Sequence, residues 1–296
     1  MIFAPQVLMC PPDHYGIEYE INPWMDRRRP ADHALAVKQW RDLRDLLERA
    51  GVTVSCLPPV AGLPDLVFTA NAAMIHGDMA ILARFRYPQR QGEEPHYERW
   101  LTEQGFHVQG LRSQAFFEGA GDALFCGDTL FAGYRIRSDV RAIHEIGALL
   151  GCRAIPLELV MPHYYHLDTC FCPLTHESAI YYPAAFDQYG RRALAEAIPH
   201  LIPVSEAEAW HFACNAVVVG QTVITNTGCP DLRRQLWIHG WAVWQTPLSE
   251  FVRAGGSAKC LTLRLDGEDA AAWKTLPAGA AAGDGSSRTG HTDETI

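Results

Sequence analysis

The sequence predicts an α/β fold built from five repeats of a small sheet and a helix, and two periodic features support this prediction. First, five segments with helical spacing of apolar residues each lead, through Gly or Pro, into a short apolar strand. Second, pairs of short strands joined by turn residues lie between these segments. The units recur roughly every forty to fifty residues, which is typical of one supersecondary unit repeated around an axis or along a stack.

The five helix-to-strand units follow one another along the chain with similar punctuation. In the first unit, residues 33–50 carry Leu35, Trp40 and Leu43 at helical spacing, and Gly51 ends the helix before a strand at 52–57. The other four units are predicted at 95–104 with 106–108, 138–150 with 152–157, 190–198 with 201–204, and 230–238 with 240–244.

The paired strands between these units are short and are separated by Gly-containing turns. Five such units around an axis would leave a central channel at which the strand ends converge. A general α/β sandwich with accidental periodicity is the alternative at this point. The strand pairs are predicted at 66–75 with 79–84, 122–125 with 129–134, 170–173 with 178–183, and 215–219 with 222–226.

Composition and charge place the chain among globular proteins. Apolar residues make up 48% and charged residues 20% of its 296 residues. The net charge of −9 argues against nucleic acid as a partner, because binding phosphates needs a basic face, and it is compatible with a small cationic substrate. No segment approaches the ~18–20 apolar residues of a membrane span, and residues 1–5 lack a signal-peptide pattern. We therefore expect a cytoplasmic protein without membrane contact.

The repeating pattern stops near the C-terminus. We expect residues 1–267 to form a single domain and residues 268–296, which are rich in Ala, Gly and Ser, to form a flexible low-complexity tail. The eight tryptophans could pack in the interior or at a subunit interface, so a homo-oligomer is left open.

The nine cysteines do not form a disulfide pattern, because their number is odd and they are widely scattered. Cys170 and Cys172 are the only close pair, and no second pair supplies further zinc ligands. We expect no metal site and no cofactor.

Cys260 is the most informative of these cysteines. It follows the Gly-rich segment 253–259 and begins an apolar-alternating run that predicts a strand. A thiol at such a junction can be held rigidly against a cavity, and a nearby cation or imidazole would favour the nucleophilic thiolate. For a cysteine considered alone, a buried structural role is the alternative.

Two polar segments could complete a hydrolytic thiol site. In the first, Asp65 and Asn71 flank an apolar run predicted as a strand. In the second, Glu118 and Asp122 are separated by Gly-Ala-Gly, which permits close backbone approach. These carboxylates would repel phosphate but match a planar guanidinium, which donates paired hydrogen bonds to carboxylates.

Two more candidates complete the set. His166 and Asp168 would share one face of a strand, an arrangement that suits an acid/base imidazole beside a binding carboxylate. Arg137 could bind a substrate carboxylate. A structural histidine and a surface arginine are the respective alternatives.

Taken in order, four motifs resemble those of the guanidino-group modifying superfamily, which includes arginine deiminases, dimethylarginine dimethylaminohydrolases, amidinotransferases and dihydrolases. They are Phe-Thr-Ala-Asn, Phe-Glu-Gly-x-Gly-Asp, His-Leu-Asp-Thr and Gly-Gly-x-x-x-Cys, and they span about residues 1–266. Each motif alone is weak, but the ordered set is specific. The resemblance implies the five-bladed α/β propeller, or pentein fold, with pseudo-fivefold ββαβ repeats.

The resemblance also implies residue roles. Cys260 would be the nucleophile, His166 the general acid/base and Glu118 the carboxylate that orients the imidazole. Asp168 would bind the guanidinium, and Asp122 would support the same pocket. The remaining implied pocket residues are Arg137 as a clamp for the α-carboxylate, together with Asn22 and Phe68.

Asn71 is a departure from deiminases and dimethylarginine hydrolases, which place Asp there; it is similar to the dihydrolase branch. A neutral amide would bind a neutral ureido group more readily than a carboxylate would. The expected function is therefore cofactor-independent hydrolysis of L-arginine to ornithine, carbon dioxide and ammonia. A deiminase, a dimethylarginine hydrolase, an amidinotransferase and a non-catalytic binding protein are the alternatives.

Overall fold

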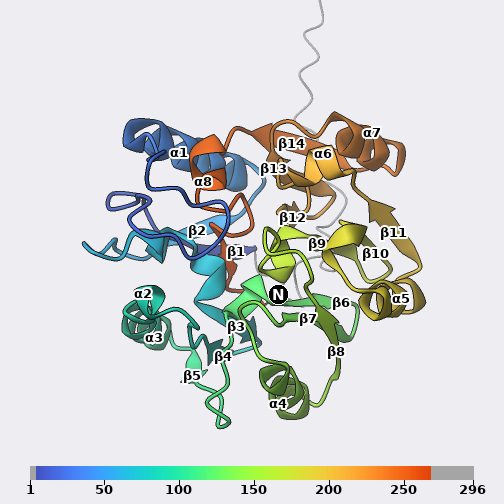
Figure 1. The fold of residues 1–296 in the computed structure, drawn as a ribbon, viewed down its shortest axis with the longest axis horizontal. Coiled ribbons are helices and arrows are strands. Elements are labelled where there is room, and N and C mark those ends of the chain that lie inside the picture. Colours follow the sequence, from blue (N-terminus) through green and yellow to red (C-terminus); the bar gives the residue numbers. More distant parts are fainter. Residues whose placement is uncertain (1–4, 268–296) are drawn as a thin grey trace, which may run out of the picture.

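Five small sheets are arranged around a common centre, with the longer helices at the rim (Figure 1). The computed structural model describes residues 5–267. Each sheet has three strands, and its middle strand pairs antiparallel with one neighbour and parallel with the other. This is the predicted arrangement of five ββαβ units around an axis.

The strands are short and follow the repeat in chain order. In four sheets, two strands form a hairpin and a helix then leads to the third, parallel strand. These sheets consist of β3 (Ala73–His76), β4 (Met79–Leu82) and β5 (His107–Gln109); β6 (Ala123–Cys126), β7 (Thr129–Tyr134) and β8 (Arg153–Glu158); β9 (Phe171–Thr175), β10 (Ser178–Tyr181) and β11 (His200–Pro203); and β12 (Val217–Val219), β13 (Thr222–Asn226) and β14 (Ala242–Thr246).

The remaining sheet joins segments from the two ends of the described chain. Its middle strand, β1 (Gln6–Met9), pairs parallel with β2 (Thr53–Cys56) and antiparallel with β15 (Leu263–Arg264). Leu8 lies opposite Leu263 in this ladder, and both are fully buried. This pairing completes the ring and fixes the position of residues 255–262, which immediately precede β15.

The rim helices form where the sequence predicts them. In α1 (His33–Arg49), Asp32 caps the N-terminus by accepting a hydrogen bond from the Leu35 amide. Trp40, Leu43 and Leu47 form its buried stripe, and burying each leucine contributes about 1.5–3 kcal/mol. The other helices are α2 (Pro88–Gln91), α3 (Glu94–Glu103), α4 (Val140–Leu150), α5 (Gln188–Ala197), α6 (Glu206–Ala209), α7 (Pro230–Ile238) and α8 (Ser249–Val252).

Three segments predicted to be strands are instead turns at the inner ends of the sheets. Residues 64–67 and 69–71 form 3₁₀ turns, so β3 begins only at Ala73 and not at 66. Residues 167–169 form another 3₁₀ turn, so His166 and Asp168 do not alternate along a strand. Cys260 also lies in a turn, three residues before β15. A short buried apolar run does not by itself distinguish a turn from a strand.

Two further expectations from the sequence concern the C-terminal tail and contact with a membrane. The tail predicted at 268–296 lies outside the described residues. Among the helices of residues 5–267, none has the length and apolar character needed to cross a membrane.

Candidate active site

A narrow cavity lies where the inner turns and loops of the sheets meet. Six of its lining residues were predicted from the sequence, and they come from segments far apart in the chain. They are Asn22, Phe68, Asn71, Arg137, His166 and Cys260. Glu118 and Asp168 are fully buried directly behind this wall, where they contact His166 and Cys260 respectively.

Glu118 joins the imidazole of His166 to the guanidinium of Arg137. Its Oε2 lies 2.7 Å from His166 Nε2 and 2.9 Å from Arg137 Nη1, and all three side chains are buried. Burial alone would raise the pKa of Glu118, but the charge of Arg137 and the hydrogen bond to His166 outweigh it and hold the pKa below its usual value. Glu118 is therefore an ionised acceptor that orients the imidazole.

The imidazole of His166 is held in one orientation. Because Nε2 faces a carboxylate, the neutral ring carries its proton there, and Nδ1 lies 3.5 Å from Asn71 Nδ2. Burial lowers the pKa of His166 to about 4, although Glu118 opposes this shift. A neutral imidazole whose Nδ1 lone pair meets only this long contact from Asn71 among the described residues can accept a proton from a group in the cavity.

Lowering the pH from 7 to 4 is expected to destabilise the protein by about 3 kcal/mol through His166. Its pKa falls from 6.5 to about 4 on folding, so this stability is present above pH 6.5 and is lost as the pH falls towards 4. Denaturant titrations at both pH values measure the change. His166→Gln should change the difference by about 3 kcal/mol by removing this contribution, whereas replacing the exposed His144 by Gln should leave it intact; equal pH dependence in all three proteins would contradict this assignment.

The thiol of Cys260 lies beside a carboxylate and an amide. Its Sγ is 3.4 Å from Asp168 Oδ2 and 3.1 Å from Asn215 Nδ2, and the residue is 3% exposed. Burial, followed by the negative charge of Asp168, raises the pKa of the thiol well above its usual value. The expected cation or imidazole beside the thiol is thus replaced by Asp168, since no hydrogen bond joins Cys260 to His166 within residues 5–267.

Two glycines before Cys260 are required by the close packing of this turn. Gly255 has a φ of +85°, and a Cβ there would lie 2.6 Å from the hydroxyl of Tyr165. A Cβ on Gly256 would lie 2.5 Å from the ring of Phe68. The Gly-Gly pair therefore lets the chain pass between two aromatic side chains of the cavity wall.

Asp122, predicted as a substrate-binding residue, does not line the cavity. Its carboxylate accepts hydrogen bonds from the Ser138 hydroxyl at 2.6 Å and from the Leu167 amide at 3.1 Å. The Ser138 oxygen in turn accepts from the Glu118 amide. Asp122 thus holds together the backbone segments that carry Glu118 and His166.

Three residues that line the cavity or contact the thiol were not predicted as site residues from the sequence. Arg90 lines the cavity, donates to Asn71 Oδ1 at 2.8 Å and forms a bidentate pair with Glu93. Asp65, considered only as a residue flanking a strand, also lines the cavity. Asn215, which contacts the thiol, was treated only as the first residue of a predicted strand. None of the three belongs to a motif with distinctive spacing.

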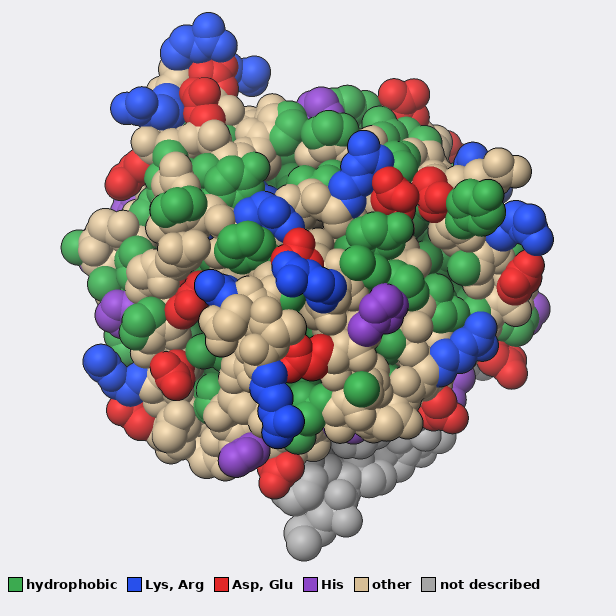
Figure 2. All heavy atoms as spheres, turned by 60° about the horizontal axis from the view of Figure 1, so that its bottom comes forward, with side chains coloured by type: hydrophobic (Ala, Val, Ile, Leu, Met, Phe, Trp, Pro, Cys, Tyr) green, Lys and Arg blue, Asp and Glu red, His purple; other side chains and the backbone are tan. Residues whose placement is uncertain are grey.

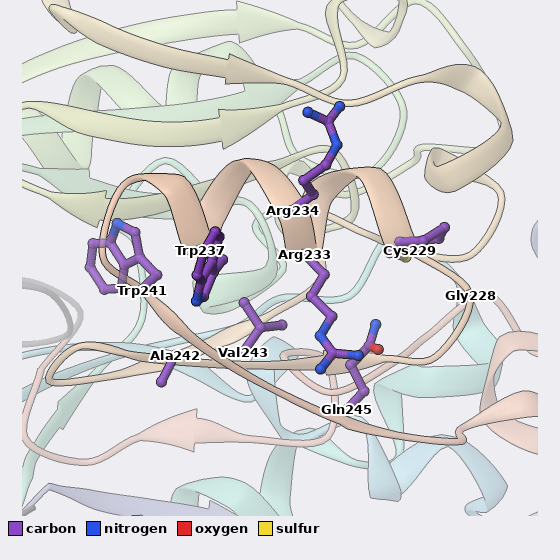
Figure 3. A pocket seen from close by; sticks show the side chains of 10 residues that line it. Gly228, Cys229, Arg233, Arg234, Trp237, Trp241, Ala242, Val243 and Gln245 are labelled. Carbon is purple, nitrogen blue, oxygen red and sulfur yellow. The ribbon is translucent and has the colours of Figure 1, made fainter.

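A larger cavity of about 690 Å³ lies over α7 and β14 and contains none of the predicted site residues (Figure 3). Arg233, Trp237 and Trp241 line it. On the face shown in Figure 2, described basic side chains alternate with acidic ones and do not gather into one patch. Within residues 5–267, no group of three or more His, Cys, Asp or Glu side chains could hold a metal ion.

The chain is similar to known proteins over most of its length. Residues 18–265 match the family model for N,N dimethylarginine dimethylhydrolase, eukaryotic. Over 265 residues the chain is 44% identical to the bifunctional arginine dihydrolase/ornithine cyclodeaminase ArgZ of Synechocystis, covering 88% of this chain and 37% of that protein. It is also 39% identical over 257 residues to the N(G),N(G)-dimethylarginine dimethylaminohydrolase of Mycobacterium tuberculosis, covering 87% of this chain and 84% of that protein.

Solved structures agree with this relationship. The product-bound N-terminal domain of ArgZ has a TM-score of 0.86 and 43% identity, and the match covers 89% of this chain and 98% of that domain. The chain thus spans less than two fifths of the curated bifunctional relatives, within their N-terminal part. The match to this domain confirms the predicted pentein fold. The chain belongs to the dimethylarginine dimethylaminohydrolase-like family of guanidino-modifying hydrolases, as its ordered motifs predicted.

Proposed function

We propose that this protein hydrolyses the guanidino group of L-arginine through a covalent intermediate on Cys260 and releases ornithine, carbon dioxide and two molecules of ammonia. The supporting observation is the pair of unsatisfied polar atoms in the cavity wall. Asp65 Oδ1 and Arg137 Nε are buried without a hydrogen-bond partner. The buried hydroxyl of Tyr19, which also lacks a well-formed hydrogen bond, is a neighbour of Asp65 and interacts with its carboxylate.

These two atoms match the ends of a free amino acid. An unpaired carboxylate oxygen suits an α-ammonium group, and an unpaired guanidinium N–H suits an α-carboxylate. Buried polar groups normally have partners, so a bound zwitterion would supply the bonds that both atoms lack. The Cys260, His166 and Asp168 side chains then remain for the guanidinium end of the substrate.

The reaction begins with proton transfer and nucleophilic attack. Because the thiol is held neutral by burial and Asp168, the arriving guanidinium supplies the positive charge that favours its thiolate. The thiol proton passes to His166 Nδ1, the sulfur attacks the guanidino carbon, and His166 then gives this proton to the departing ammonia. The product of this half-reaction is a thiouronium bonded to Cys260.

Water then completes the first round. His166 Nδ1 removes a proton from water, which adds to the thiouronium carbon, and the C–S bond breaks to give citrulline and the free thiol. A second attack on the ureido carbon expels the second ammonia and leaves a thiocarbamate on sulfur. Its hydrolysis yields a carbamate that separates into carbon dioxide and ornithine. The sum is arginine plus two waters to ornithine, carbon dioxide and two ammonia.

Relatives support both the substrate and the covalent route. A mutant of AgrE, which is similarly related to this chain, has been solved with L-arginine. The N-terminal domain of ArgZ carrying an Asn-to-Ser change has been solved covalently bound to a reaction intermediate. The sulfur chemistry proposed here predicts such an adduct on Cys260.

Substrate competition tests this assignment against its rivals. We expect turnover of L-arginine to exceed that of Nω,Nω-dimethylarginine by at least tenfold and to be independent of an added amine acceptor. A preference for dimethylarginine would identify a dimethylarginine hydrolase. Dependence on the amine would identify an amidinotransferase, and binding without turnover of any substrate would indicate a non-catalytic binding protein.

Asn71→Asp is expected to shift the product from ornithine towards citrulline by at least tenfold in ratio. Asn71 lies between Arg90 and His166 Nδ1, so a carboxylate there would favour the cationic guanidinium over the neutral ureido group. A difference of about 1.4 kcal/mol between the two substrates corresponds to this factor. Amino-acid analysis at complete conversion of arginine measures the ratio. Ornithine as the sole product of the variant would contradict this role of Asn71.

A further inference from the structure

We propose that Asn215 is a further catalytic residue, whose side-chain amide binds the sulfur of Cys260 and stabilises its thiolate. This proposal deepens the proposed function, because it concerns the nucleophile of the same site. Asn215 Nδ2 donates to Cys260 Sγ at 3.1 Å, and Asn215 is fully buried. A hydrogen bond to the charged form of a group lowers its pKa, and a thiolate is that form here.

The orientation of the amide follows from its other hydrogen bonds. Asn215 Oδ1 accepts from the backbone N–H of Cys260 at 3.2 Å, so the NH₂ group must face the sulfur. The second hydrogen of that NH₂ group is used by the carbonyl of Asp168 at 3.0 Å. Both ends of the amide are therefore engaged, and its donor cannot rotate away from Sγ without breaking bonds to Cys260 and Asp168.

The loop that presents Asn215 has an unusual backbone conformation. Phe212 is a fully buried aromatic residue with a φ of +59°, a region that bulky side chains rarely adopt. The backbone N–H of Asn215 donates to the Phe212 carbonyl at 2.9 Å, which ties the strained residue to the position of the asparagine. Such strain costs on the order of 1–3 kcal/mol and is typical of functional segments.

The electrostatic surroundings give this donor a specific task. Burial and the Asp168 carboxylate both raise the pKa of the Cys260 thiol, while the hydrogen bond from Asn215 opposes them. Negative charge develops on sulfur when the thiol is deprotonated and again when the C–S bond breaks. A fixed, buried N–H donor aimed at that atom stabilises the charge in both steps.

Alkylation of Cys260 by iodoacetamide tests the proposal without relying on turnover. The rate is followed against pH by mass spectrometry of the peptide that contains Cys260. For Asn215→Ala, we expect the midpoint of the profile to rise by about one pH unit, which slows alkylation about tenfold below the midpoint. With arginine, kcat/KM should fall roughly 10²-fold, as for the loss of one donor to a developing anion.

Two further variants separate this role from a purely structural one. Asn226 is also buried and bridges two backbone groups, the His211 carbonyl and the Leu248 amide, without touching the thiol. Asn226→Ala should lose stability but keep the parent alkylation profile. Asn215→Asp retains the acceptor for Cys260 N–H but replaces the donor with an oxygen, so its midpoint should rise at least as far as that of the Ala variant.

The outcome of the alkylation test does not depend on whether the protein hydrolyses arginine. An unchanged midpoint in Asn215→Ala or, if that variant does not fold, in Asn215→Asp would overturn the proposal and leave Asn215 as a structural anchor, whether or not arginine is turned over. A raised midpoint would support the proposal even if the parent protein failed to hydrolyse arginine.

Discussion

Replacing Cys260 with Ala is expected to abolish hydrolysis of arginine, with a loss of at least about 10⁴-fold, while the variant still binds the substrate. The thiol supplies the atom to which the guanidino carbon is bonded, and no other cysteine lines the cavity among the described residues. The groups proposed to bind the amino-acid end, Asp65 and Arg137, are unaffected by the substitution. Affinity for L-arginine should therefore stay within about tenfold of the parent value, or 1.4 kcal/mol.

Turnover assays and calorimetric titration with L-arginine measure the two effects. Cys126→Ala is a matched control, because Cys126 is buried in β6 and hydrogen-bonded to backbone carbonyls of the neighbouring sheet. Its thiol should be dispensable for turnover. Residual hydrolysis by Cys260→Ala above about one ten-thousandth of the parent rate would contradict a covalent role for this thiol.

Glu118→Gln is expected to lower kcat by roughly 10²–10³-fold and to reduce stability by about 3 kcal/mol or more. The amide has the size of the carboxylate, but it leaves the buried guanidinium of Arg137 without an anionic partner. It also removes the charge that orients His166 and stabilises its protonated form during proton transfer. Both effects follow from one atom, because Glu118 Oε2 accepts hydrogen bonds from both Arg137 and His166.

The pair between Arg135 and Glu158 provides the control. It has a similar N–O distance of 2.7 Å, but its side chains are 57% and 32% exposed. Glu158→Gln should therefore change stability by less than about 1 kcal/mol and leave kcat unchanged. Denaturant titration and steady-state assays compare the two variants. Equal, small effects of both substitutions would contradict the account of Glu118 as the charged centre of the site.

Periodicity predicted the repeating unit because each unit repeats the same local signals, and the family resemblance implied the closed ring. The helix 33–50 differs by one residue from α1, and the helix 230–238 matches α7. Each is amphipathic and is followed by a glycine, so local spacing determines both ends. Closure of the ring through β1 and β15 joins residues about 250 apart, and no local signal in either segment predicts that pairing.

The candidate site was predictable where a polar residue belonged to a motif, and not elsewhere. Cys260, His166 and Glu118 were identified from ordered motifs, and the structure brings them to one cavity wall or directly behind it. Arg90 and Asn215 act through contacts with residues far away in the chain, namely Asn71 and Cys260. A single arginine or asparagine has no spacing that reveals such a partner, so only the folded chain identifies it.

The inner turns explain why the sequence did not predict the partners of His166 and Asp168. His166 and Asp168 were expected on one face of a strand, but a 3₁₀ turn carries them towards different partners, Glu118 and Cys260. Strand and turn both bury the same apolar neighbours, so hydrophobic pattern does not separate them. The turn thereby places the imidazole beside Glu118 and a carboxylate beside the thiol, while both His166 and Cys260 line one cavity.

Product stoichiometry after complete conversion of L-arginine tests the central claim most directly. Amino-acid analysis and ammonia determination are made on the same sample, with Cys260→Ala as the blank. The account predicts one ornithine and two ammonia for each arginine consumed, and none of either with the variant. One citrulline and one ammonia, with no ornithine on prolonged incubation, would contradict it and identify a single-round deiminase.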